Sequence, residues 1–125
     1  MTHISNIDEL RKLTEKLDET SKIRLIVEGI EHTMSFNEIA YSTKNIVFGI
    51  SSGRDSLEVK TVGDLRDYTD SFDGCYTIDF VTMTELSEYE QMIMGDRRFQ
   101  LPYRIDVSNG LDCNVEGDEL IVTIR

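Results

Sequence analysis

Two segments of this chain, 55 positions apart, share one pattern of helix followed by strand. The stretch NIDELRKLTEKLDETSKIRLIV at 6–27 aligns without a gap over TVGDLRDYTDSFDGCYTIDFVT at 61–82. In both stretches apolar residues recur at helical spacing, and a strand-like alternation follows. The pattern predicts two copies of one structural unit. Five aligned pairs are identical: Leu10/Leu65, Arg11/Arg66, Thr14/Thr69, Asp18/Asp73 and Ile23/Ile78.

A second match occurs further along the chain in the same order. ISSGRD at 50–55 lies over VSNGLD at 107–112, now at an offset of 57. We interpret the two matches as a tandem duplication, with repeats at 6–60 and 61–125. The alternative is that two amphipathic helix-to-strand units resemble each other by chance.

The local patterns favour an α+β fold in a single domain spanning 1–125. A helix is expected after Asn6, with Asn6 as N-cap and Glu9 as its capping-box partner, and a second helix after Thr61. A third short helix is expected in TELSEYEQMIMGDRRF, with Ser87 and Glu90 as capping box. The remaining segments resemble strands, so we expect two or three helices packed on a mainly antiparallel sheet of six to eight strands.

Several strand connections can be assigned from turn residues. Glu28-Gly29 predicts a tight hairpin turn, and Asn109-Gly110 is the strongest short hairpin signal in the chain. Residues 30–41 fit either a strand that follows the first turn or a short helix in SFNEIAYS. The final ELIVTIR is rich in β-branched residues and predicts a strand, which is also a candidate sheet edge for self-association.

The second half of the chain carries most of the negative charge. Residues 1–60 hold ten acids and eight bases, a net of −2, whereas residues 61–125 hold fourteen acids and five bases, a net of −9. The segment from Thr61 to Asp96 contains nine acidic residues and one basic residue, Arg66. Such a field repels nucleic acid and anionic membranes and attracts basic proteins.

The acidic helix region is therefore the candidate partner-binding surface. Carboxylates three positions apart on a helix rise by about 4.5 Å per step, comparable with the phosphate spacing of a nucleic-acid strand, so such a row can occupy a basic groove. The surface could equally be a solvated face that serves solubility alone. An exposed Tyr68 or Tyr89 would add an aromatic anchor. The candidate residues are Asp64, Asp67, Asp70, Asp73, Glu85, Glu88, Tyr89 and Glu90.

Motifs of the common enzyme classes are absent from the sequence, so we expect no catalytic residues and no cofactor. His3 falls in a terminus expected to fray, and His32 stands alone. Cys75 and Cys113 lack the spacing of a zinc site and are expected to be small buried thiols. DCNVEGDE at 112–119 begins like a calcium loop, but Thr123 replaces the required glutamate, so we expect no metal site. We expect a soluble, cytoplasmic protein, because no segment resembles a membrane span or a signal peptide.

TVGDLRDYTDSF resembles a T-V-G-E-L opening helix found in small uncharacterised bacterial and phage proteins, a likeness that implies no activity. A small acidic chain without cofactor motifs is also similar in kind to bacterial toxin-immunity proteins and to phage anti-restriction or anti-CRISPR inhibitors. This likeness is one of composition and transfers no residues.

Together these features favour a non-enzymatic inhibitor that docks on a basic, nucleic-acid-handling partner, such as a nuclease, a toxin or a nucleic-acid-binding complex. The alternative is an assembly protein that forms homodimers or larger oligomers through a sheet edge.

Overall fold

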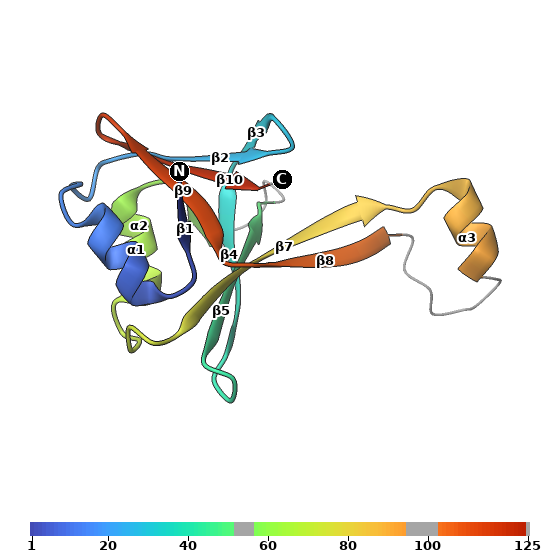
Figure 1. Cartoon of the computed structure of the whole chain (residues 1–125), viewed down its shortest axis with the longest axis horizontal. Coiled ribbons are helices and arrows are strands. Elements are labelled where there is room, and N and C mark those ends of the chain that lie inside the picture. Colours follow the sequence, from blue (N-terminus) through green and yellow to red (C-terminus); the bar gives the residue numbers. More distant parts are fainter. Residues whose placement is uncertain (52–56, 95–102, 125) are drawn as a thin grey trace.

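The computed structural model describes residues 1–51, 57–94 and 103–124 (Figure 1). These residues form three helices and ten strands, so the chain has the α+β fold that the sequence predicts. The helices are α1 (Ile7–Thr14), α2 (Val62–Thr69) and α3 (Glu88–Met94). The strands are β1 (Thr2–Ile4), β2 (Ile23–Val27), β3 (Ile30–His32), β4 (Met34–Ala40), β5 (Asn45–Ile50), β6 (Glu58–Val59), β7 (Thr77–Glu85), β8 (Tyr103–Asn109), β9 (Leu111–Glu116) and β10 (Glu119–Ile124).

The strands of the described residues divide between two five-stranded sheets. One sheet has the order β1-β9-β10-β2-β3, and the other has the order β6-β4-β5-β7-β8. Most neighbours are antiparallel, but β2 runs parallel to β10, and β5 runs parallel to β7. The prediction of a single sheet with six to eight strands is wrong. The strand that follows α1, β2, pairs with β10, and the strand that follows α2, β7, pairs with β5, so each sheet combines strands from both halves of the chain.

The two sheets correspond to each other strand by strand. Replacing β1, β2 and β3 by β6, β7 and β8, and β9 and β10 by β4 and β5, turns the first strand order into the second. Each sheet therefore takes strands from both halves of the chain, and α1 and α2 lie together beside them (Figure 1). The two halves are intertwined, although a tandem duplication as their origin stays a prediction.

The second sequence match does not fall on corresponding positions. ISSGRD starts at the end of β5 and continues into residues 52–55, which lie outside the described residues. VSNGLD instead runs from β8 into β9. By strand order the counterpart of β5 is β10, so this match between 50–55 and 107–112 is a resemblance of turn residues alone.

The predicted N-cap residues, Asn6 and Thr61, lie at the starts of α1 and α2. The Asn6 side chain accepts a hydrogen bond from the Glu9 backbone N–H at 2.9 Å. The Glu9 carboxylate, however, accepts from the Ser5 hydroxyl at 3.2 Å, rather than from Asn6 as expected of a capping box. At α2 the capping box is complete, between Thr61 and Asp64. The helix starts are thus set by short-range bonds that the sequence signals directly.

The helices α1 and α2 hold each other through equivalent bonds. The Arg11 guanidinium donates to the backbone oxygens of Thr69 at 2.9 Å and Phe72 at 3.0 Å. The Arg66 guanidinium donates to those of Thr14 at 3.1 Å and Leu17 at 2.8 Å. Each arginine thus adds a hydrogen bond to carbonyls at the end of the other helix, where the Thr14 and Thr69 oxygens also accept from the N–H groups of Leu17 and Phe72.

One apolar core joins both sheets and both of these helices. Its members include side chains fully screened from solvent in the parallel pairs β2–β10 and β5–β7. Burial of a large apolar side chain contributes roughly 1.5–3 kcal/mol, so the exchanged strands carry much of the stability. The largest fully buried side chains are Phe48, Phe80, Ile4, Ile7, Leu25, Met34, Ile46, Ile78, Leu111, Leu120, Val59 and Val62.

The structure settles the open assignments of turns and edges. Residues 30–41 form β3 and β4, so the helical alternative is wrong. Glu28 and Gly29 have φ angles of 50° and 81° and make the predicted hairpin between β2 and β3. Gly110 follows β8 but makes no hairpin, because the chain crosses there from one sheet to the other. The final strand β10 is interior to its sheet, so it cannot be the edge expected for self-association.

The contact beneath Gly63 provides a test of the intertwined packing. The Gly63 N–H donates to the Glu19 oxygen at 3.0 Å, and a Cβ at position 63 would lie 2.9 Å from that oxygen. Alanine for glycine in a helix normally stabilises by up to about 1 kcal/mol. We expect Gly63→Ala instead to lower the free energy of unfolding by about 1–3 kcal/mol, because the backbone of the opposing loop must move.

Chemical denaturation monitored by circular dichroism measures this effect. The exposed Asp67→Ala on the same helix serves as control and should leave stability unchanged or slightly raised. A Gly63→Ala variant as stable as the wild type would contradict the proposed close contact.

Candidate protein-binding surfaces

The first candidate residue on α2, Asp64, has a structural role. Its carboxylate accepts from the backbone N–H of Lys60 at 3.0 Å and of Thr61 at 3.2 Å. In return the Asp64 N–H donates to the Thr61 hydroxyl at 3.1 Å. This capping box accounts for an aspartate at position 64 without a partner protein.

The next three candidates, Asp67, Asp70 and Asp73, are exposed on α2 and the turn that follows it. The ion pairs found among the described residues are His3–Asp112, Arg24–Glu31 and Lys60–Glu58, and none of them involves these aspartates. Arg66 lies nearby in sequence, but its guanidinium donates to carbonyls of the α1 end. The three exposed carboxylates form a surface that we call the α2 acidic face; Arg11 and Arg66 line a hollow beside Asp70, at the edge of this face.

The two tyrosine candidates differ in exposure. Tyr68 stacks on Phe36 with ring centroids 4.8 Å apart and an interplanar angle of 9°, so it belongs to the packing of the body rather than to a binding surface. Tyr89 lies on α3 and is 72% exposed. Of these two candidates, Tyr89 is the one with the exposure that the predicted aromatic anchor requires.

Glu88, Tyr89 and Glu90 lie far from the α2 acidic face. A two-stranded ribbon of β7 and β8 projects from the body and carries α3 at its end, whereas α2 lies on the opposite side of the molecule (Figure 1). Glu85 closes β7, and its side chain lies outside the described part of the chain. The structure therefore divides the candidate residues into two separate groups.

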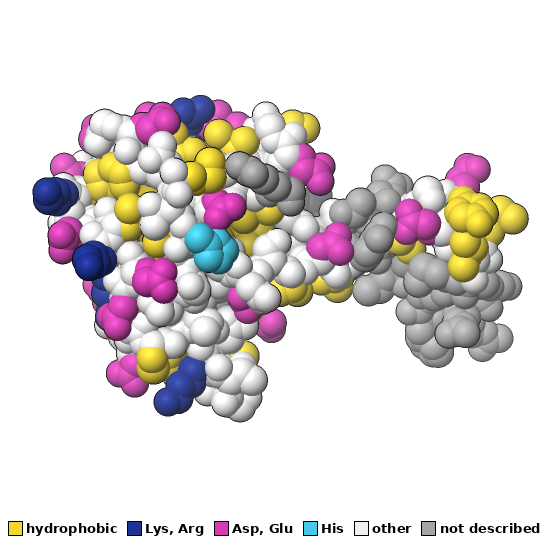
Figure 2. Space-filling model, in the orientation of Figure 1, with side chains coloured by type: hydrophobic (Ala, Val, Ile, Leu, Met, Phe, Trp, Pro, Cys, Tyr) yellow, Lys and Arg dark blue, Asp and Glu magenta, His cyan; other side chains and the backbone are white. Residues whose placement is uncertain are grey.

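The start of α3 has the predicted cap. The Ser87 hydroxyl accepts from the Glu90 N–H at 3.2 Å and donates to the Glu90 carboxylate at 3.2 Å. Glu90 thus has a local role like that of Asp64, whereas the Glu88 side chain is exposed. Figure 2 shows hydrophobic and acidic side chains together at the end of the projecting ribbon.

The ribbon also exposes an apolar face that sequence reasoning missed. Val81 pairs with Val107, and Met83 pairs with Ile105, so their side chains share one face of the ribbon. Met83, Ile105 and Val107 are 62%, 49% and 60% exposed. The sequence did contain a signal for this face. In β7, Ile78 and Phe80 lie on one face and Val81 and Met83 on the other, whereas a strand with one solvated face needs apolar residues on one face only.

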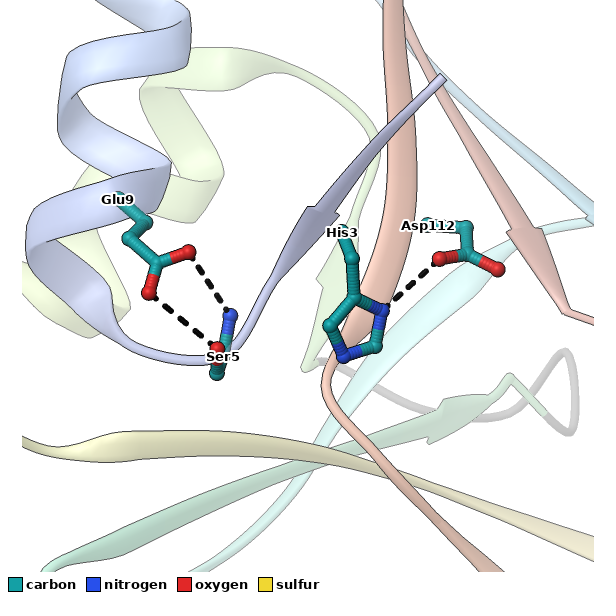
Figure 3. A network of polar contacts seen from close by, with 4 residues as sticks. All are labelled: His3, Ser5, Glu9 and Asp112. Atoms are coloured by element: carbon teal, nitrogen blue, oxygen red, sulfur yellow. Dashed lines mark hydrogen bonds and ion pairs between the residues drawn. The ribbon is translucent and has the colours of Figure 1, made fainter.

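The N-terminus is ordered by its own contacts, contrary to the expected fraying. His3 lies in β1, which pairs with β9, and its Nδ1 is 2.9 Å from the Asp112 carboxylate (Figure 3). Ser5 donates through its N–H and hydroxyl to Glu9 in the same region. Asp112, the first residue of the calcium-like stretch, is thus engaged in joining β1 to β9.

The described residues contain neither a cluster of metal-ligand side chains nor a membrane-spanning helix. Three or more His, Cys, Asp or Glu side chains do not converge as metal ligands anywhere in 1–51, 57–94 and 103–124. The helices of the same residues are too short or too polar to cross a bilayer.

Comparison of the chain with protein-family models, with curated proteins and with solved structures found no significant match. The function must therefore be argued from the surfaces themselves.

The two cysteines differ in accessibility, and this provides a test of the structure. Cys113 is buried as expected, but Cys75 is exposed, so the expectation of two buried thiols is wrong. Burial raises the pKa of the Cys113 thiol to about 12, which keeps it protonated and unreactive at pH 8. We expect a thiol reagent at pH 8 to modify Cys75 in the folded protein and Cys113 only after denaturation.

With a thiol reagent that releases a coloured group on reaction, the absorbance of that group counts the reactive thiols. A Cys75→Ser variant should lose the reaction of the folded state and keep that of the unfolded state. Two equally fast thiols in the native wild type would show that Cys113 is accessible.

Proposed function

We propose that the protein is a non-enzymatic, acidic binding protein that docks on a basic protein and blocks it. The observation that carries this proposal is the α2 acidic face, where Asp67, Asp70 and Asp73 are exposed and stand outside the ion pairs of the described residues. A surface of this charge attracts a partner rich in Lys and Arg.

Comparison with α1 supports a role beyond solubility. The equivalent of Asp73 is Asp18, whose carboxylate accepts from the Thr20 N–H at 2.9 Å and from its hydroxyl at 2.6 Å. These bonds, the Thr20 hydroxyl first among them, lower the pKa of Asp18. In the second half Cys75 stands in place of Thr20, so the hydroxyl that donates to Asp18 has no equivalent beside Asp73.

The position of Asp67 shows the same contrast. Its equivalent is Lys12, so α1 mixes charges where α2 is acidic. The scaffold contacts of the two helices are nevertheless equivalent. The fold thus tolerates a base at this position, and the acid calls for another explanation, which a basic partner supplies.

A nucleic-acid-handling enzyme is the partner class that we favour. Such proteins carry basic grooves for phosphates, and the exposed carboxylates at the end of α2 and in the turn after it present negative charge that such a groove attracts. Binding there would exclude the nucleic acid, which gives inhibition without catalysis. The electrostatic part of such binding acts mainly on the association rate and weakens with salt.

Charge reversal on α2 tests the proposal. We expect Asp67→Lys/Asp70→Lys to reduce capture of a basic partner from native-host extract by about tenfold at low salt, without lowering the melting temperature. Wild-type capture should fall as salt is raised, because the exposed charges are screened.

A matched control changes the net charge equally at another place. Glu116→Lys/Asp118→Lys, at the exposed turn between β9 and β10, should reduce capture much less. Equal losses for the two variants would assign the effect to net charge rather than to the α2 acidic face.

A second candidate function is self-assembly through the edge strand β8. This strand ends its sheet, and its exposed Ile105 and Val107 lie beside exposed Met83. An uncovered edge with an apolar face can pair with a second copy.

Light scattering coupled to size exclusion separates this candidate from the first. Self-assembly predicts a mass at least twice the 14.4 kDa of the chain, and Val107→Lys should return the protein to the monomer by placing a charge on the shared face. A monomer over a wide range of concentrations would rule the candidate out.

A further inference from the structure

We propose that α3 is the apolar anchor of this binding protein and inserts Tyr89, Met92 and Ile93 into a groove on the partner whose rim carries Lys and Arg. This inference rests on the proposed function, because it names the surface that holds the partner and the groove that receives it.

The spacing of the three side chains gives α3 one apolar face. Positions 89, 92 and 93 are related by three and four residues, which places them together on a helix. Tyr89, Met92 and Ile93 are 72%, 79% and 66% exposed. Three large apolar side chains at this spacing are the pattern by which a helix fills an apolar groove.

The position of α3 keeps this face away from the body of the molecule. It stands at the end of the β7–β8 ribbon, whose pairing runs from Asp79–Asn109 to Glu85–Tyr103 (Figure 1). Local bonds hold α3 in place: the Gln91 side chain donates to the Leu86 oxygen at 3.0 Å. The helix is thus anchored through its start, and the apolar face points to solvent.

The counterpart hairpin shows that the fold does not require such an extension. By strand order β2 and β3 correspond to β7 and β8, and they are joined directly by Glu28 and Gly29. The sheet that contains β2 and β3 is complete without a helix at that place. The extension in the second half is therefore accounted for by binding rather than by folding.

Charge defines the rim of the receiving groove. The charged side chains of α3 are Glu88 and Glu90, and the helix has no base in its last turn. Figure 2 shows acidic side chains beside the apolar group at the end of the ribbon. An apolar groove bordered by Lys and Arg complements both features.

A photo-crosslinker at position 89 tests where α3 binds. Tyr89→benzoylphenylalanine should crosslink to a partner at an apolar groove that has Lys or Arg at its border, as located by mass spectrometry of the joined peptides. Tyr41→benzoylphenylalanine is the matched control, because Tyr41 is 67% exposed on a different part of the molecule. This variant should not crosslink to the apolar groove of the partner.

The purified partner then allows the affinity to be measured. Ile93→Glu should weaken binding by about 30-fold or more, as expected for loss of a central apolar anchor. Ile30→Glu is the control, since Ile30 is 63% exposed on the counterpart hairpin, and it should change the affinity less than about threefold. Circular dichroism checks that both variants remain folded.

The outcomes separate this inference from the proposed function. If wild type binds a basic partner in a salt-dependent way but Ile93→Glu binds equally well, the anchor is wrong and the proposed function stands. If wild type captures no basic partner, the proposed function fails. Crosslinking of Tyr89→benzoylphenylalanine to a second copy of the chain, or to a surface lacking bases, overturns the anchor.

Discussion

The exchange of strands between the two halves of the chain is the interaction on which the structure depends. Within its own half β2 pairs only with the short β3, and its other neighbour is β10 from the far end of the chain. Likewise, β5 obtains its parallel neighbour β7 from the second half. Neither half completes a sheet alone, so the core forms only when both halves are present. The bonds from Arg11 and Arg66 to the opposite helix ends fix the same exchange on the helical side.

The exchange also explains which parts of the fold the sequence predicts. Helix starts at Asn6 and Thr61 follow from bonds within three residues, so they can be identified locally. Strand pairing is nonlocal, and a buried strand such as NIVFGI satisfies the same apolar pattern beside any neighbour. Asn109-Gly110 misled for this reason, because a turn signal does not specify whether the next strand returns to the same sheet. For the candidate binding surfaces, composition indicated the acids, whereas the exposure of Tyr89 and the packing of Tyr68 required the structure.

The two halves use equivalent contacts with different residues, and this separates folding from function. Where α1 begins, the Asp8 N–H donates to the Gly74 oxygen, and where α2 begins, the Gly63 N–H donates to the Glu19 oxygen. Each contact has one glycine, on opposite partners, because two side chains would not fit there. Such differences are explained by packing. Packing does not explain the α2 acidic face or the extension that carries α3, so these are the places to look for function.

The two surfaces that we propose for binding would act on a partner in different ways, because they lie far apart. The α2 helix precedes β7 and α3 follows it, and nine residues of strand extend for about 30 Å. The screening length at physiological ionic strength is about 8 Å, so the field of the α2 acidic face is weak at α3. Under the proposed function, the aspartates of the α2 acidic face would govern encounter with a basic surface near the body, whereas burial of Tyr89, Met92 and Ile93 would govern how long the complex lasts. The proposed partner would have to reach from the body to the end of the ribbon to contact both surfaces, a requirement that the proposed nucleic-acid-handling protein with an extended basic surface would meet and a small peptide would not.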